Sequence, residues 1–138
     1  MKELLYEGLG FPIRLKGVKT QEFRGEILPD INHRQLEDMV FKALLWAPMR
    51  LSGARLAFIR GYMKISQKGF ADLLGMKSHA TVSGWENKGN KVPSMPTGLE
   101  VAIRMLMADY IRDDSFPREF RKFFEVREKT KELRLKVA

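Results

Sequence analysis

The pattern of apolar and polar positions predicts a short β-like stretch followed by a series of helices. In residues 9–28, large apolar side chains occupy every second position from Phe11 to Leu15, and a second, less regular run follows Gly17. Alternation with a period of two is typical of strands that bury one face. We therefore expect two short strands in this stretch, with a hairpin as one arrangement.

From residue 32 onward, apolar residues recur every three or four positions, which predicts amphipathic helices. Most of them should begin at a residue whose side chain can accept a hydrogen bond from a free backbone N–H, and these residues are Asn32, Ser52, Ser66 and Ser78. A further helix is expected from Pro96 or Thr97. Pro48 should end the first helix, and Gly75 the helix that starts at Ser66.

A last amphipathic helix is expected from about Pro117. Its apolar positions are Phe116, Phe120, Phe123 and Phe124, which we interpret as core or as a dimer interface. The tail from Arg127 to Ala138 is expected to be solvated and frayed. The chain then divides into a small N-terminal α+β segment (1–50), a helical domain (51–112), and a C-terminal amphipathic helix with a charged tail (113–138).

Charge is distributed unevenly along the chain. There are 25 Lys and Arg against 17 Asp and Glu, a net charge of +8. Residues 1–50 hold 8 basic and 7 acidic side chains and residues 93–138 hold 10 and 8, whereas residues 51–92 hold 7 and 2, a local net charge of +5. A local basic excess is expected of a nucleic-acid-binding surface, and it also fits a solvated face without a partner.

Composition excludes several kinds of site. Cysteine is absent, which excludes disulfides, thiolate metal sites and cysteine nucleophiles. His33 and His79 lie far apart in sequence, so we expect no metal site. There is no membrane-spanning apolar run and no signal-peptide core, so we expect a cytoplasmic protein. We find no phosphate-cradling glycine motif, P-loop, zinc-protease motif or nucleophile elbow, and expect neither an enzyme nor a cofactor.

The order of residues in the segment 66–88 predicts two short helices joined by a tight turn. Ala71 is small where a second helix would cross the first, and Gly75 can reverse the chain. Val82 and Trp85 fall on one face of the second helix and can fill a core. The outer face of residues 78–88 would then be free to contact DNA.

This segment combines three features: the helix start Ser66-Gln67, the small residues Ala71 and Gly75 four positions apart, and the ending Trp85-Glu86-Asn87. In this combination the chain resembles the Xre-like (phage-repressor-type) helix-turn-helix family over roughly residues 51–110. The resemblance implies a mainly α fold, with a five-helix domain that is here preceded by the small α+β segment with two short strands.

A looser likeness extends upstream. It rests on the segments 29–32, 50–53 and 58–60, whose sequences are Pro-Asp-Ile-Asn, Arg-Leu-Ser-Gly and Phe-Ile-Arg. These are similar to MqsA-like antitoxins, which join a small N-terminal domain to a helix-turn-helix. The zinc-binding cysteines of that group are absent here, so such a domain would have to hold together without metal.

The helix-turn-helix resemblance implies roles for individual residues. Gln67 would bond a DNA phosphate, and Arg60 would form a structural ion pair with Glu86. The recognition helix would approach base edges with its early residues and with two residues one turn later; the set is Ser78, His79, Ala80, Thr81, Ser83 and Gly84. Lysines that flank this surface are candidate phosphate contacts, namely Lys68, Lys77, Lys88 and Lys91.

Two departures from the family pattern affect base reading. The turn from Gly75 to Thr81 is one residue longer than is common, which can shift the start of the recognition helix by one residue. Gly84 stands where a long polar side chain often reads bases, and there is no Arg or Asn pair for bidentate contacts. We therefore expect specificity to draw on DNA shape or on residues outside the helix.

The first hypothesis is a sequence-specific double-stranded DNA-binding transcriptional regulator, a repressor that acts as a homodimer. The alternative is an antitoxin of a type II toxin–antitoxin pair, which binds a toxin protein and represses its own operon. The separate N-terminal part motivates this alternative. RNA binding is a third and weaker hypothesis, because no aromatic-basic stacking signature on a sheet is present.

Overall fold

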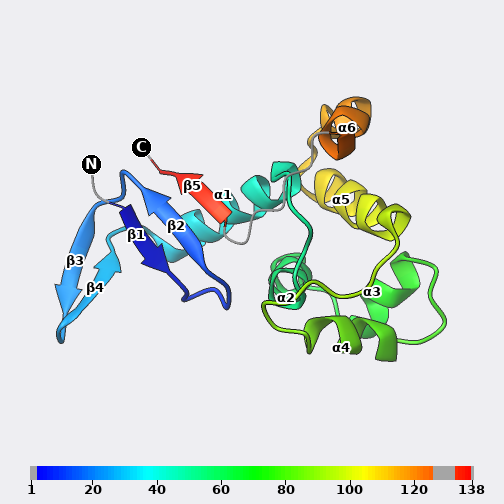
Figure 1. Ribbon diagram of the computed structural model, residues 1–138, viewed down its shortest axis with the longest axis horizontal. Helices are drawn as coiled ribbons and strands as arrows, with labels where there is room; N and C mark the ends of the chain where they lie inside the picture. The colour runs from blue at the N-terminus through cyan, green and yellow to red at the C-terminus, as the bar shows by residue number, and fades with distance from the viewer. Residues whose placement is uncertain (1–2, 126–132, 138) are drawn as a thin grey trace. The chain divides into compact units, whose positions relative to one another are not determined.

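The computed structural model describes the backbone of residues 3–125 and 133–137, and the side chains of these residues except 121–125. Within this part the chain forms six helices and five short strands, a mixed α+β composition (Figure 1). The chain divides into two compact units, Met1–Ala47 with Thr130–Ala138, and Pro48–Lys129. Each unit is described by itself below.

The first unit contains a three-stranded sheet with strands from both ends of the chain. Its strands are β1 (Glu3–Tyr6), β2 (Ile13–Lys16) and β5 (Leu133–Lys136), in the order β1-β2-β5. β1 runs antiparallel to β2, and β5 runs parallel to β2. Ile13, Leu15, Leu133 and Leu135 are buried along the sheet, which agrees with the alternation of apolar and basic residues in both strands.

A separate hairpin is formed by β3 (Thr20–Phe23) and β4 (Glu26–Pro29), which pair antiparallel. The two residues between them, Arg24 and Gly25, both have positive φ, at 51° and 83°. A two-residue turn of this kind matches the right-handed twist of the paired strands. Phe23 and Ile27 remain exposed on the hairpin.

The strands correct the sequence-based expectation in three places. Residues 9–28 hold β2, β3 and most of β4 rather than two strands, and β2 pairs with β1, which was not expected. The expected frayed tail contains β5, whose Leu133 and Leu135 are buried. Burial of an alternating Leu-Arg-Leu-Lys segment against a sheet outweighs its solvation, because two leucines leave water together. The other residues of that expected tail lie outside the described part, except Val137.

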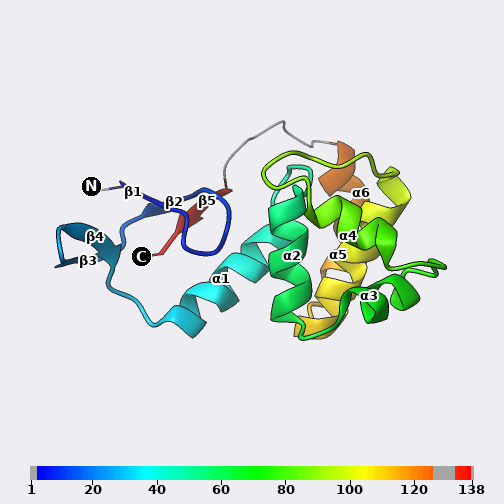
Figure 2. The same cartoon turned by 90° about the horizontal axis from the view of Figure 1, so that it is seen from below.

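Helix α1 (His33–Trp46) completes the first unit and lies on one side of the three strands (Figure 2). It begins as expected at Asn32, whose side-chain oxygen accepts from the Gln35 N–H at 3.1 Å, and it ends before Pro48. The side chains of this helix that are buried are Leu36, Val40, Phe41, Leu44 and Leu45.

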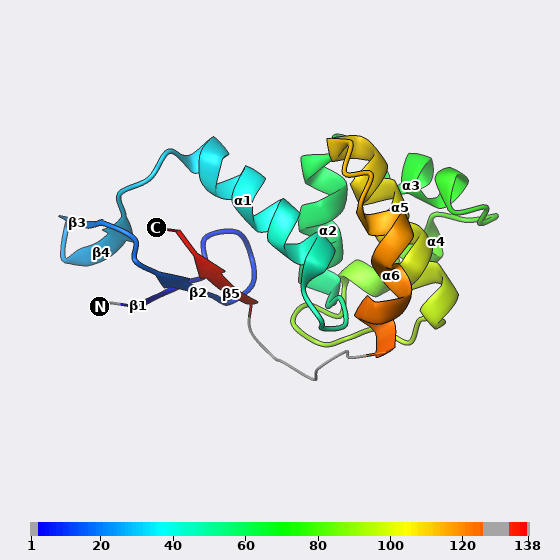
Figure 3. The same cartoon turned by 90° about the horizontal axis from the view of Figure 1, so that it is seen from above.

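In its described residues, 48–125, the second unit contains helices and no strand. They are α2 (Gly53–Tyr62), α3 (Gln67–Leu73), α4 (Ala80–Glu86), α5 (Thr97–Ile111) and α6 (Phe116–Glu125). Figure 3 shows α5 and α6 side by side. α2 and α3 begin at the expected caps, where Ser52 Oγ accepts from the Arg55 N–H and Ser66 Oγ from the Gly69 N–H.

Buried residues of the second unit come from all five helices and include Leu56, Ile59, Phe70, Val82, Trp85, Ile103, Met107 and Phe116. Phe120 is half-buried, while the side chains of Phe123 and Phe124 lie outside the described part. The expected division at residue 112 differs from the structure. α6 packs on α5 and belongs to the second unit, whereas β5 belongs to the first.

Candidate nucleic-acid interface

Helices α3 and α4 pack against each other through a few buried side chains. Phe70 and Ala71 of α3 and Val82 and Trp85 of α4 are buried, and α4 packs on α2 as well. Between the two helices, Gly75 has a φ of 71°, a left-handed conformation that glycine adopts without steric cost. The inner faces of the two helices are therefore those that the sequence predicts.

The start of α4 lies one residue later than predicted. Its first helical residue is Ala80, and His79 takes the capping position without a side-chain hydrogen bond. Ser78 Oγ still accepts from the Ala80 N–H at 3.1 Å, so the hydroxyl satisfies a free backbone donor from just outside the helix. The extra residue of the turn accounts for the shift.

The candidate DNA-contacting residues lie on the outer side of this helix pair. All of them are exposed except Gln67 and Ser83, which are half-buried; the exposed ones are Lys68, Lys77, Ser78, His79, Ala80, Thr81, Gly84, Lys88 and Lys91. On α4, Ala80 and Gly84 are four residues apart and therefore share one side of the helix. The buried residues Val82 and Trp85 lie on the opposite side. The outermost ridge of α4 therefore carries one methyl group and one bare Cα.

The ion pair expected between Arg60 and Glu86 is present and joins α2 to the end of α4. Arg60 Nε donates to Glu86 Oε2 at 2.7 Å, and Arg60 Nη2 donates to Oε1 at 3.0 Å. Arg60 Nη1 also donates to the carbonyl oxygen of Ile65 at 2.9 Å. The hydrogen bonds to Glu86 raise the pKa of Arg60, against a smaller effect of burial. Such a bidentate contact fixes the relative orientation of the two side chains as well as the distance between them.

Gln67 belongs to the same network. Its side-chain Nε2 donates to Glu86 Oε1 at 3.2 Å, so the carboxylate of Glu86 receives donors from both α2 and α3. Sequence reasoning assigned Gln67 to a DNA phosphate and did not foresee this bond. The bond orients the Gln67 amide at the first residue of α3.

The loop after α4 is anchored to the first residues of α2. The Gly53 N–H donates to the carbonyl oxygen of Lys91 at 3.1 Å, and the Ala54 N–H donates to that of Gly89 at 2.8 Å. A side chain at Gly53 would overlap the carbonyl oxygen of Trp85. The close approach of the two backbones therefore requires glycine, and it fixes the positions from which Lys88 and Lys91 extend.

The local charge of the segment 51–92 is mostly displayed on the surface. Of its seven basic residues, Arg55 is buried and Arg60 is paired with Glu86, while the five lysines are exposed. They are Lys64, Lys68, Lys77, Lys88 and Lys91. The other acidic residue of the segment, Asp72, is exposed. Five exposed positive charges thus stand against one exposed negative charge.

A buried charge network elsewhere in the second unit was not predicted. Arg104 and Glu100 are both fully buried on α5 and lie 3.6 Å apart. Arg104 Nη2 donates to the carbonyl oxygen of Met49 at 2.6 Å, and Arg50 Nη2 donates to that of Met95 at 2.9 Å. Opposite charges four residues apart in the apolar stripe of a helix were the available signal.

This network holds the segment just before α2 against α5. Arg50 Nε lies 3.5 Å from Glu100 Oε2, and Arg55 Nη1 donates to the carbonyl oxygen of Arg50 at 3.1 Å. Burial lowers the pKa of Arg55. We interpret these contacts as architectural, since they join chain segments to one another through backbone carbonyls.

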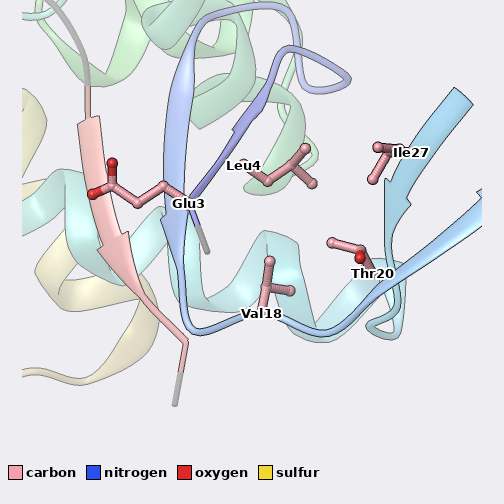
Figure 4. A pocket seen from close by; sticks show the side chains of 5 residues that line it. All are labelled: Glu3, Leu4, Val18, Thr20 and Ile27. Atoms are coloured by element: carbon pink, nitrogen blue, oxygen red, sulfur yellow. The ribbon is translucent and has the colours of Figure 1, made fainter. Parts of the chain in front are cut away.

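Other candidate sites are poor in chemistry. A cavity of about 200 Å³ in the first unit is lined by Glu3, Leu4, Val18, Thr20 and Ile27 (Figure 4). The Glu3 carboxylate points away from the other four side chains in Figure 4 and lies 3.4 Å from Lys16, so apolar groups and one hydroxyl face the cavity. Among the described residues, no group of three or more His, Asp or Glu side chains is placed to hold a metal ion. No helix in that same part of the chain is long and apolar enough to cross a membrane.

Comparison of the chain with protein-family models, with curated proteins and with solved structures finds no match.

Proposed function

We propose that the second unit binds double-stranded DNA through a helix-turn-helix formed by α3 and α4, with α4 in the major groove. In this proposal the protein is a sequence-specific transcriptional regulator, a repressor that acts as a homodimer. The observation that carries it is the outer surface of α3 and α4. This surface is exposed along both helices and is flanked by four exposed lysines, Lys68, Lys77, Lys88 and Lys91.

Phosphate contacts would surround the recognition helix. Lys68 lies in the first turn of α3, and Lys88 and Lys91 lie in the loop that α2 holds in place. The Gln67 amide has two N–H donors, and its bond to Glu86 uses one of them. The second can reach a phosphate from an orientation that the ion pair already fixes. Such contacts set register on the duplex and do not read sequence.

Base contacts would come from small side chains. Thr81 and Ser83 offer hydroxyl groups on either side of the bare ridge, and the methyl groups of Ala80 and Thr81 can contact the methyl group of thymine. A ridge with a glycine at residue 84 lets the helix backbone approach the base edges closely. With few bidentate donors available, the deformability of the DNA would contribute much of the discrimination.

The proposal is tested by selecting binding sites from a random DNA pool, followed by a salt titration of the selected duplex against a scrambled one. We expect a palindromic motif, because a two-fold dimer reads two half-sites about one helical turn apart. Equal binding to all sequences, with loss of binding in high salt, would leave only backbone electrostatics and contradict sequence-specific regulation.

Lysine variants connect that experiment to the structure. Lys68→Ala and Lys88→Ala should weaken binding to all sequences alike and reduce the salt slope by about one. Lys19→Ala is the matched control, because Lys19 is an exposed lysine of the first unit. His79→Ala and Ser83→Ala should alter sequence preference. If both left preference and affinity unchanged, α4 would not be the recognition helix.

A second candidate function is binding of a toxin protein by the first unit, as an antitoxin does. Exposure of Phe23 and Ile27 on the β3–β4 hairpin favours a protein partner for this unit. Co-expression with a small protein encoded beside this chain, followed by pull-down, tests it. Phe23→Ser with Ile27→Ser should release that protein, and retention of the protein would contradict this placement of the masking surface.

A further inference from the structure

The three-stranded sheet of the first unit has one apolar face and one charged face. Leu135 shares a surface hollow with Met39, Ala43 and Trp46 of α1, so the leucines of β5 lie on the side that α1 covers. Side chains alternate between faces along a strand. The opposite face is therefore formed by the remaining residues of the strands, namely Glu3, Leu5, Arg14, Lys16, Arg134 and Lys136.

This second face, which we call the basic sheet face, carries four basic residues and one acidic residue, a net charge of +3. Arg134 and Lys136 are exposed, and Arg14 and Lys16 are half-buried. Glu3 lies 3.4 Å from Lys16. The face combines residues from the two ends of the chain, so no local stretch of sequence displays it.

Like charges occupy neighbouring positions across the two strands. The register places Arg14 beside Arg134 and Lys16 beside Lys136, on strands that run about 4.8 Å apart. The sequences of β2 and β5, Ile-Arg-Leu-Lys and Leu-Arg-Leu-Lys, match position by position except for one aliphatic exchange. Like charges beside each other across strands destabilise a sheet. Glu3 offsets part of this repulsion at Lys16, and an anion bound to the face would reduce the repulsion further.

We propose that the basic sheet face binds the phosphodiester backbone of double-stranded DNA, as a second contact beyond the recognition helix; the choice of DNA rests on the proposed function. Basic residues two apart on one strand are separated by about 6.6 Å, which is comparable with the distance between neighbouring phosphates of one nucleic-acid strand. Four cations in two rows can thus meet successive phosphates, and release of counterions from the DNA favours the contact.

Backbone binding fits this face better than binding of single-stranded nucleic acid. A sheet that binds unpaired bases presents aromatic side chains on which the bases stack. The one apolar side chain among the six outward positions is Leu5. The face therefore offers charge without a stacking surface, which suits a sequence-independent contact with duplex DNA flanking the recognised site.

The test is the double variant Arg134→Glu with Lys136→Glu in the full chain. Because both like-charge pairs then become pairs of opposite charge, we expect the thermal unfolding temperature of the first unit to rise. Affinity for a long duplex that contains the selected site should fall at least tenfold at low salt, and the salt slope should decrease by about two. Sequence preference should stay unchanged. A variant that is more stable and binds DNA less well would indicate that the basic residues of this face serve ligand binding rather than stability.

Lys19→Glu with Lys42→Glu is the matched control, since both are exposed lysines of the same unit outside the basic sheet face and the change in net charge is identical. If the two double variants lose the same affinity, the effect is one of net charge and the proposal is overturned. Loss of binding to single-stranded RNA with unchanged binding to duplex DNA would also overturn it. If Arg134→Glu with Lys136→Glu fails to fold, Arg134→Gln with Lys136→Gln carries the same test.

The two proposals fail separately. Lys68→Ala with Lys88→Ala removes contacts of the second unit and leaves the basic sheet face intact. Residual salt-dependent binding of this variant to scrambled duplex, abolished by adding Arg134→Glu and Lys136→Glu, would support the basic sheet face even if no sequence motif is selected. A selected motif together with unchanged binding by the sheet variant would support the recognition helix and overturn the present inference.

Discussion

At the scale of single residues, the Glu86 carboxylate joins three helices. It accepts hydrogen bonds from Arg60 of α2 and from Gln67 of α3, while it belongs to the last turn of α4. A carboxylate in this position fixes the angle between α3 and α4 through directional bonds, which apolar packing alone does not supply. The orientation of the proposed DNA-binding surface therefore depends on a residue that need not touch DNA.

We predict that Glu86→Ala destabilises the protein by roughly 2 kcal/mol, because it leaves a half-buried guanidinium without its carboxylate. Urea unfolding followed by circular dichroism measures the change. Glu119→Ala removes an exposed carboxylate from the same unit and is the control. Equal losses for the two variants would show that the ion pair contributes no more than a surface charge does.

A substitution at Gly84 is expected to change stability and DNA affinity in opposite directions. An added Cβ at this position would meet nothing within 4 Å, and alanine in an exposed helical position is favoured over glycine by about 1 kcal/mol. We therefore predict that Gly84→Ala raises the free energy of unfolding by about that amount and lowers affinity for the selected DNA, because the methyl group would stand between helix and bases. Parallel denaturation and fluorescence-anisotropy titrations check both parts, and a gain in affinity would contradict close approach of α4.

At the scale of secondary-structure elements, the contact between α2 and the end of α4 relies on one glycine. Gly53 faces the carbonyl oxygens of Trp85 and Glu86, whereas Gly61 on the same helix has open space around it. We predict that Gly53→Ala costs at least about 2 kcal/mol through overpacking. Gly61→Ala should stabilise by up to about 1 kcal/mol. Thermal unfolding of both variants measures these changes. An unchanged unfolding temperature for Gly53→Ala would contradict the close approach of the α2 and α4 backbones.

Helix starts could be predicted from sequence because capping is local. Asn32, Ser52 and Ser66 each bond a backbone N–H three residues ahead, so sequence alone contains both partners. β5 could not be predicted in the same way. Its partner is β2, which lies more than one hundred positions earlier in the chain. Strand pairing at such separation is decided by tertiary packing.

At the scale of the whole molecule, the candidate site was predictable in composition and not in detail. The lysines around α3 and α4 are exposed as expected, since long charged side chains seldom leave water. The bond from Gln67 to Glu86 and the burial of Arg104 with Glu100 depend on which helices meet, and no local pattern encodes that. The basic sheet face lay beyond sequence reasoning for the same reason, because its two rows of charge come from opposite ends of the chain.

Strand β5 comes from the last residues described and belongs to the sheet of the first unit, next to β2. The contribution of β5 to this sheet can be tested. Leu133 is buried beside Ile13 in β2, so Leu133→Ala should cost about 3 kcal/mol in the first unit through lost burial and a cavity. Native-state hydrogen exchange should then show β2 amides exchanging roughly a hundredfold faster, with the amides of α5 in the second unit as internal reference. Leu5→Ala, on the exposed face of the same sheet, should leave these rates nearly unchanged. Unaltered β2 exchange in Leu133→Ala would mean that the sheet is stable without β5, and the tail would then be free to fray as its charge suggests.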